Sequence, residues 1–217
     1  MKIERFYDIN LAHASYAIVS KDEMALIDPA RDPQPYYEFA IANNVTITAV
    51  IETHPHADFV SSHMEIQKKT NATVYVSRLL GAEYDHQSFD DGDEVQIGEV
   101  RLKAINTPGH SPDSISVLLL DETGREHAIF TGDTLFIGDV GRPDLRENVG
   151  NLTAKREALA RQMYDSIQNK MTQIPDETLV YPAHGAGSLC GKNLSSDPYS
   201  TMGKERKDNW AFQQQSE

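Results

Sequence analysis

The amino-acid sequence predicts an α/β fold of the α+β kind, with two β-sheets between outer helices. Strand-like apolar runs outnumber helical segments, and the order is strands, helix, strand, helix, several strands, helix, strand. No low-complexity tract divides the 217 residues, and a chain of this length buries a sizeable core without cross-links. We therefore expect a single domain, 1–217, in which residues 192–217 form a C-terminal tail.

The composition limits the classes of protein and partner. Hydrophobic residues make up 39% of the chain and charged residues 24%, which is typical of soluble globular proteins. The formal net charge of −13 argues against nucleic acid and anionic membranes as partners. No apolar run approaches the roughly 20 residues of a membrane span, and the first residues have no signal-peptide pattern. The single cysteine, Cys190, excludes an internal disulfide framework, so we expect a cytoplasmic protein.

In the first half of the chain, short apolar runs alternate with turns. Pro35 begins a helix that we expect to reach residue 43, since the N–H that proline lacks would be unpaired in a first turn. Ser62 and Glu65 have capping-box spacing, which predicts a helix to about residue 69. The polar residues 81–93 show no period. Strands are expected over residues 2–7, 16–20, 24–27, 45–51 and 73–76.

In the second half, Leu159, Met163 and Ile167 form one apolar stripe of a helix expected over residues 152–169. Residues 136–151 are rich in Gly, Asp and Arg and predict a long loop, a kind of segment that is often functional. Strands are expected over residues 95–97, 100–105, 114–120, 128–130 and 179–181, with Leu118, Leu119 and Leu120 buried on both faces of the sheet.

His and Asp residues follow several of these strands directly. A strand ending in a short loop is the rigid platform that converging metal ligands need. Repetition of this pattern at four turns predicts a metal site. The residues are His54, His56 and Asp58 after the first such strand, then His110, Asp133 and His184.

These motifs, taken in order, resemble those of the metallo-β-lactamase superfamily. The resemblance implies an αββα sandwich, in which two mixed sheets are flanked by helices and the metal ligands lie on loops along one edge. It covers nearly the whole chain. The motifs are Thr53-His54-Pro55-His56-Ala57-Asp58, Pro108-Gly109-His110, Thr131-Gly132-Asp133 and Pro182-Ala183-His184.

Within the superfamily, the chain most resembles persulfide dioxygenase domains that are fused to rhodanese domains. The shared stretches are Ala57-Asp58-Phe59, Gly141-Arg142-Pro143-Asp144-Leu145 and residues 183–191. A second resemblance is to glyoxalase II, a two-metal thioester hydrolase whose motif has histidine where this chain has Phe59. No rhodanese domain is recognised in residues 1–217. We interpret the chain as a stand-alone relative or one domain of a longer protein, with a separate rhodanese as a candidate partner.

The residue at position 59 favours a single metal, because a phenyl ring has no lone pair to donate. The resemblance implies one Fe(II) held by His54, His110 and Asp133, the facial triad of non-haem oxygenases. Zn is the alternative metal, for which His56 would be a third histidine ligand. We favour His56 as a hydrogen-bonding residue near the iron. The resemblance further implies that Asp58 and His184 are remnants of a second metal site.

The resemblance implies oxidation of a thiol persulfide, such as glutathione persulfide, by O2 to sulfite and thiol. The alternatives are a thioester hydrolase of the glyoxalase II type and a non-enzymatic sulfur-carrier or interaction module that works with a rhodanese. Arg142 is the expected cation for an anionic thiol carrier, unless it pairs with Asp139 or Asp144. Cys190 is expected to contact the substrate and accept sulfur, unless it is an inert buried thiol.

Several other residues have structural interpretations. Tyr16 is expected to pack in the core, and the alternative is that it lines the pocket. The loop 136–151 and the tail, with Trp210 and Phe212, predict a homodimer interface, unless these aromatic residues pack within their own chain. Four histidines match no ligand position and are interpreted as surface or capping residues: His13, His63, His86 and His127.

Overall fold

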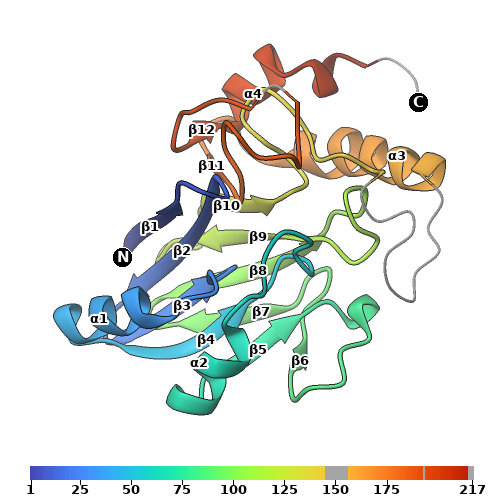
Figure 1. Ribbon diagram of the computed structural model, residues 1–217. Coiled ribbons are helices and arrows are strands. Elements are labelled where there is room, and N and C mark those ends of the chain that lie inside the picture. Colours follow the sequence, from blue (N-terminus) through green and yellow to red (C-terminus); the bar gives the residue numbers. More distant parts are fainter. Residues whose placement is uncertain (145–155, 193, 215–217) are drawn as a thin grey trace.

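The computed structural model describes residues 1–144, 156–192 and 194–214. Two six-stranded sheets pack face to face, and helices cover both outer sides (Figure 1). One sheet has the strand order β1-β2-β3-β4-β5-β6 and the other β12-β11-β10-β9-β8-β7. The predicted αββα sandwich of two mixed sheets is confirmed.

The first sheet is antiparallel at β1, β2 and β3 and parallel from β3 to β6. Its outer face is covered by α1 (Gln34–Asn43) and α2 (His63–Thr70), whose buried residues Tyr36 and Ile66 pack with Val50. Because β3, β4 and β5 are parallel, their carboxyl ends meet at one edge. The strands are β1 (Lys2–Asp8), β2 (His13–Ser20), β3 (Glu23–Ile27), β4 (Thr46–Ile51), β5 (Thr73–Val76) and β6 (Gln87–Ser88).

The second sheet is covered by α3 (Arg156–Asp165) and α4 (Met202–Asp208) (Figure 1). Of the predicted stripe, Met163 and Ile167 pack in the cluster that covers this sheet, and Leu159 is fully buried. The helix continues as a π-helical turn, Ser166–Lys170, and a 3-10 turn, Met171–Gln173. The strands are β7 (Glu94–Ile97), β8 (Val100–Asn106), β9 (Ile115–Leu120), β10 (Glu126–Gly132), β11 (Leu179–Pro182) and β12 (Ser200–Thr201), and two further 3-10 turns are Arg78–Leu80 and Trp210–Gln213.

An aromatic cluster between the sheets joins β2 to β10 and β11. The ring of Phe130 stacks on Tyr181 with centroids 5.4 Å apart and lies 5.0 Å from the ring of Tyr16. The hydroxyl of Tyr16 donates to the carbonyl oxygen of Pro182 at 2.6 Å. Tyr16 therefore packs in the core, as predicted, and holds the strand that leads to His184.

The structure differs from the prediction in a few elements. Ser62 precedes α2 but makes no capping hydrogen bond through its side chain, so the predicted capping box is wrong. The tail contains β12, which pairs with β11, and α4, whose first turn is capped by Thr201. These elements depend on pairing with distant strands. The predicted helix start at residues 152–155 lies outside the described residues.

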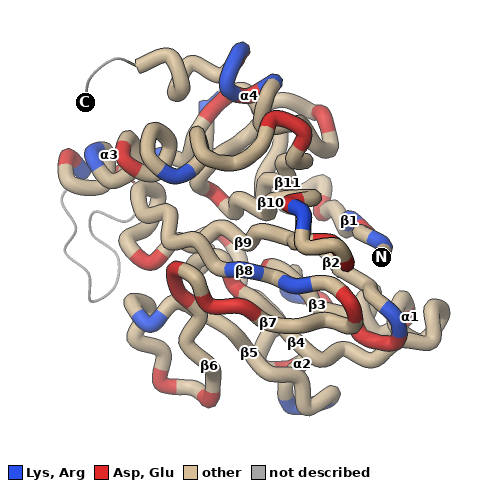
Figure 2. The backbone as a smooth tube through the Cα atoms, turned by 180° about the vertical axis from the view of Figure 1, so that it is seen from behind, with Lys and Arg blue, Asp and Glu red and all other residues tan. Residues whose placement is uncertain are grey.

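The described part of the predicted loop, residues 136–144, is irregular yet largely buried, with Phe136 fully enclosed. Trp210 is 51% exposed, and its indole N–H donates to Asp139 at 2.8 Å. The homodimer stays a prediction. Within the described ranges, no helix has the length and apolar character to cross a membrane. Charged residues lie mainly on the helices and loops, while the central strands are mostly uncharged (Figure 2).

Candidate metal centre

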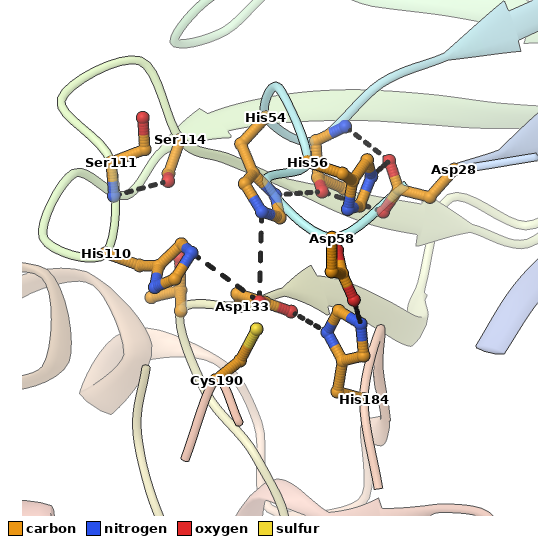
Figure 3. Close-up of polar contacts among 12 residues, drawn as sticks. Asp28, His54, His56, Asp58, His110, Ser111, Ser114, Asp133, His184 and Cys190 are labelled. Atoms are coloured by element: carbon orange, nitrogen blue, oxygen red, sulfur yellow. Dashed lines mark hydrogen bonds and ion pairs between the residues drawn. The ribbon is translucent and has the colours of Figure 1, made fainter. Parts of the chain in front are cut away.

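The predicted ligands lie together at one edge of the sandwich, on loops from both sheets (Figure 3). His54 follows β4, His110 lies between β8 and β9, Asp133 follows β10, and His184 follows β11. Backbone hydrogen bonds join the sheets at this edge, from Ile115 N to the Thr53 carbonyl at 2.8 Å and from Ala14 N to the Ala183 carbonyl at 2.7 Å.

His54, His110 and Asp133 form a buried triad whose ligand atoms all lie within 4.8 Å of one another. Oδ2 of Asp133 is 3.8 Å from Nε2 of His54 and 3.6 Å from Nε2 of His110. This oxygen is buried and has no hydrogen-bond partner among the described residues. A buried carboxylate oxygen normally has a partner, and an orphan that faces two imidazole nitrogens fits a metal ion. The triad therefore fits one ion bound on one face.

The orientation of His54 depends on two residues that the sequence analysis did not assign to the site. Asp28, at the end of β3, accepts from the backbone N–H and the hydroxyl of Thr53, both at 2.7 Å. The Thr53 oxygen lies 3.0 Å from Nδ1 of His54 and can accept its proton. Nε2 of His54 is then left with its lone pair, the form that a metal ligand needs.

His110 is oriented by the main chain of the following loop. Its Nδ1 lies 3.0 Å from the carbonyl oxygen of Arg142, which can only accept. Nδ1 therefore carries the proton and Nε2 is free for a metal. The guanidinium of Arg142 forms two hydrogen bonds with Asp144, at 3.0 and 2.7 Å. This is one of the two ion pairs that the sequence analysis left as alternatives. The carbonyl of Arg142 therefore orients His110, while its side chain is paired with Asp144.

Burial sets the charge of the triad. It lowers the pKa values of His54 and His110, because a low-dielectric surrounding disfavours the charged imidazole. Burial also works against ionisation of Asp133, but His184, and then His54 and His110, hold the pKa of its carboxyl well below the usual range. The site presents two neutral imidazoles and a carboxylate at neutral pH, which are the forms that bind a metal.

His184 lies between two carboxylates (Figure 3). Its Nδ1 is 2.7 Å from Asp133 Oδ1, and its Nε2 is 3.0 Å from Asp58 Oδ2. Ionised carboxylates only accept, so both nitrogens donate and His184 is an imidazolium. Burial opposes this charge, yet Asp133 and then Asp58 raise the pKa of His184 far above its ordinary value. One oxygen of Asp133 therefore accepts a hydrogen bond from His184, and the other is available to a metal ion.

His56 lies beside the triad but is grouped with other carboxylates. Its Nε2 is 3.2 Å from Asp28 Oδ1 and 3.9 Å from Glu52 Oε2. Burial opposes protonation of His56, but Asp28 and Glu52 raise its pKa above the ordinary value. The ring centroids of His56 and His54 are 4.3 Å apart. Both ring nitrogens of His56 lack a hydrogen-bond partner among the described residues, so the predicted hydrogen-bonding role stays a prediction.

The interpretation of His13 as a surface or capping residue is wrong. His13 is 1% exposed. The centroid of its ring lies 4.3 Å from that of Phe59 and 5.3 Å from that of His184. It is buried because β2 begins at the ligand edge, where His13 forms a bridge with His184. Burial, helped by His56 and His184, lowers the pKa of His13 to about 3. His63 is also partly buried, and its Nδ1 lies 3.6 Å from Oε1 of Glu52.

Replacing Thr53 with valine is expected to weaken metal binding about 10- to 100-fold, as loss of a partner behind a metal ligand typically does. The change leaves Asp28 and His54 without the hydroxyl that joins them. Thr48→Val on β4, the strand that precedes Thr53, is a matched control, because the Thr48 hydroxyl has no hydrogen-bond partner among the described residues. Metal affinity measured by chelator competition should fall only in Thr53→Val. Equal affinities in the two variants would contradict this role.

Replacing Gly141 with alanine is expected to disrupt the triad. A Cβ atom at this position would lie 1.8 Å from the carbonyl oxygen of Asp133 and 3.0 Å from Cβ of His110. The backbone must move, since real Cβ atoms do not approach so closely. Gly185→Ala is the control, because its Cβ would meet no atom closer than 3.5 Å. The thermal unfolding temperature and the metal content should both fall in Gly141→Ala and stay near wild type in Gly185→Ala.

The fold and the ligand set together define the class of protein. Residues 9–184 match the family model described as the metallo-beta-lactamase superfamily. The chain belongs to this superfamily, as its sequence motifs indicated.

Three relatives show which kinds of superfamily member this chain is similar to. A crystal structure of a metallo-beta-lactamase from Staphylococcus aureus subsp. aureus COL has a TM-score of 0.92 and 40% identity, and the match covers 99% of this chain and 65% of that one. Human mitochondrial persulfide dioxygenase ETHE1 is 29% identical over 164 residues, 75% of this chain and 59% of its own. A probable hydroxyacylglutathione hydrolase of Schizosaccharomyces pombe is 29% identical over 213 residues, 86% of this chain and 76% of its own. This chain spans less than two thirds of the first two proteins.

Proposed function

We propose that the protein is a mononuclear non-haem Fe(II) persulfide dioxygenase, which oxidises a thiol persulfide such as glutathione persulfide with O2 to sulfite and thiol. The observation that carries the proposal is the triad of His54, His110 and Asp133. Two neutral imidazoles face the Asp133 oxygen that has no hydrogen-bond partner among the described residues. Two histidines and one carboxylate are the ligand set of non-haem Fe(II) oxygenases. The relatives that match this chain include a persulfide dioxygenase.

The residues of the site fit this chemistry. Bound Fe(II) would supply the redox chemistry that activates O2, which Zn²⁺ lacks. His54, His110 and Asp133 would hold the ion, and a set of three protein ligands would leave it accessible to O2 and the substrate. Thr53 and the Arg142 carbonyl hold the two imidazoles in the required tautomer. The imidazolium of His184, 2.7 Å from Asp133, adds positive charge that favours an anionic persulfide.

The carrier of the persulfide has room beside the ligands. A cavity of about 310 Å³ is lined by His54, Phe59, Val60, Leu80 and Tyr84, among others. Its largely apolar wall suits the body of a small thiol carrier. We propose that the guanidinium of Arg142 also binds an anionic group of the carrier, through the part that is not paired with Asp144. The side chain of Arg142 is 36% exposed. A separate rhodanese and a second copy of the chain are the proposed protein partners, and the cytoplasm is the proposed compartment.

The second candidate is a metal-dependent thioester hydrolase, favoured by the match to a probable hydroxyacylglutathione hydrolase. Hydrolysis at two metals needs a full second ligand set, and Phe59 stands where glyoxalase II motifs have histidine. The phenyl ring is packed against His13 and His56. A non-enzymatic sulfur-carrier module ranks last, because all three triad residues converge.

Oxygen uptake with glutathione persulfide, beside hydrolysis of a glutathione thioester, separates these activities. The protein is reconstituted with Fe(II) without air and then given each substrate. We expect persulfide-dependent oxygen consumption with an equal amount of sulfite, and no thioester cleavage above background. Thioester hydrolysis without oxygen uptake would overturn the proposal in favour of the hydrolase.

A further inference from the structure

The helix that follows residue 155 contains a rare kind of turn. After α3 the helix widens into the π-helical turn Ser166–Lys170, in which the backbone N–H of Met171 donates to the carbonyl of Ser166. π-Helical turns are uncommon and are found frequently at functional sites. This turn packs beside the loop between β8 and β9, which carries His110 (Figure 1). Its polar contacts with that loop indicate what it does there.

Ser166 joins the π-helical turn to a residue two places before His110. Ser166 is 2% exposed, and its hydroxyl donates to the carbonyl oxygen of Pro108 at 2.7 Å. Serine is a weaker helix former than alanine, because its hydroxyl competes for the backbone groups of its own helix. Here the hydroxyl bonds to another segment. The contact with the loop therefore explains a serine at this position, and the helix does not.

Lys170 holds the start of the same loop. Its ammonium donates to the carbonyl oxygen of Asn106 at 2.6 Å and to Oδ2 of Asp91 at 2.8 Å. Oδ1 of Asp91 accepts from the backbone N–H of Asn106, also at 2.6 Å. The ion pair therefore engages both backbone groups of the last residue of β8. Its side chains are 35% and 55% exposed, and such pairs contribute little to stability, so its main effect is on the position of the loop.

The other backbone polar groups of residues 106–108 are paired with neighbouring loops. The N–H of Thr107 donates to the carbonyl of Ser114 at 2.9 Å, and its carbonyl accepts from the hydroxyl of Thr134 at 3.0 Å. Pro108 has no N–H. The π-helical turn thus supplies the partners of the carbonyls on either side of Thr107. A shift of this segment would break at least one buried hydrogen bond, which is unfavourable.

Gly109 brings the loop into contact with the backbone of α3. A Cβ atom at this position would lie 2.6 Å from Cα of Met163, so only glycine permits the approach. The next residue is His110, whose Nδ1 is oriented by the carbonyl of Arg142. The helix therefore fixes the main chain that leads to His110, and the loop after β10 fixes its ring.

We propose that Ser166 and Lys170 are positioning residues of the metal site, which hold the main chain before His110 so that its Nε2 faces Asp133. Loss of the Ser166 hydroxyl leaves the buried carbonyl of Pro108 without its partner, and the loop moves to find another. Nε2 of His110 then shifts relative to the other ligands, and a metal site needs its ligands held to within about 0.5 Å. The inference rests on the proposed function in one respect, the assignment of His110 as a ligand, and it does not depend on the reaction.

Titration of the metal-free protein with Co²⁺ tests the proposal, because the visible ligand-field absorption of Co²⁺ reports both binding and the geometry of the ligands. Ser166→Ala should lower the affinity for the first equivalent of Co²⁺ about 10-fold, the smaller end of the effect of an outer partner. At saturating Co²⁺, its absorption band should differ from that of the wild type in position and intensity. A merely structural role of Ser166 would leave the band unchanged.

Ser20→Ala is the matched control. Ser20 is 3% exposed, and its hydroxyl accepts from the backbone N–H of Glu99 at 2.9 Å. It is the last residue of β2, whose first residue lies at the ligand edge, so it is remote from the triad. Ser20→Ala should lower the thermal unfolding temperature and leave the Co²⁺ affinity and the band as in the wild type.

Lys170→Met is a second variant, at a partly exposed side chain whose replacement leaves no cavity in the core. It should lower the Co²⁺ affinity about threefold, less than a direct partner of a ligand would, because Asn106 lies four residues before His110. Lys204→Met is its control, an exposed lysine of α4 that pairs with Asp197 at 3.8 Å. This control should bind Co²⁺ as the wild type does.

His110→Ala separates this inference from the proposed function. If His110→Ala loses the first Co²⁺ while Ser166→Ala and Lys170→Met keep the wild-type affinity and band, the positioning role is wrong and the triad stands. Equal losses of affinity in Ser166→Ala and Ser20→Ala would also overturn the positioning role. If His110→Ala binds Co²⁺ as tightly as the wild type, the triad is wrong and this inference is wrong with it. Oxygen uptake is a separate readout, so failure of the dioxygenase activity leaves these results interpretable.

Discussion

Asp133→Asn is expected to yield a folded protein that retains little or no iron and has no persulfide-dependent oxygen uptake. Asp133 supplies the only anionic ligand of the triad, and its free oxygen faces both imidazoles. An amide oxygen carries no charge to offset a divalent ion. The loss of iron affinity should exceed the roughly 10- to 100-fold effect of removing an outer partner. Iron content and oxygen uptake on the same preparation measure both consequences.

A variant of a second buried carboxylate, Asp90, is the control that distinguishes loss of metal binding from loss of stability. Asp90 is 2% exposed and accepts hydrogen bonds from Ser77 at 2.8 Å and Arg78 at 3.0 Å. Asp90→Asn should lower the free energy of unfolding but leave iron content at one per chain. If Asp133→Asn kept its iron, or if both variants lost it equally, the assignment of the triad would be wrong.

Phe130→Ala is expected to lower the free energy of unfolding by about 3–5 kcal/mol, as buried Phe-to-Ala changes typically do. Phe130 is 1% exposed and packs against Tyr16 and Tyr181, so its removal leaves a cavity between the sheets. Urea denaturation followed by circular dichroism measures the change. Leu79→Ala, at a site that is 54% exposed, should stay within about 0.5 kcal/mol of the wild type. A loss below about 1 kcal/mol for Phe130→Ala would show that the cavity collapses freely.

The strands, and the gathering of the His and Asp side chains that follow them, could be predicted from the sequence because both depend on local patterns. Apolar runs give the strands, and a His or Asp directly after a strand lies at its carboxyl end. Parallel pairing of β3 with β4 and of β10 with β11 brings such ends together at the ligand edge. The order of the runs is compatible with two sheets between outer helices, and the resemblance to the metallo-β-lactamase superfamily implied the αββα sandwich.

The contacts that orient the ligands could not be predicted, because they join residues far apart in the chain. Asp28 and Thr53 are separated by 25 residues, and His110 and Arg142 by 32. The aspartate at the end of β3 and the threonine before His54 were the available signals, and only the fold shows that they meet. His13 was misplaced for the same reason: its burial depends on a bridge to His184.

The most direct test of the triad is electron paramagnetic resonance of the Fe(II)-loaded protein with nitric oxide, combined with elemental analysis of the same sample. Nitric oxide reports an open coordination position on a mononuclear iron. The wild type should give a high-spin iron–nitrosyl signal that accounts for about one iron per chain. His54→Ala, His110→Ala and Asp133→Asn should each lose it. Two zinc ions per chain with no iron–nitrosyl signal, or a signal that survives loss of the triad ligands, would contradict a single iron at His54, His110 and Asp133.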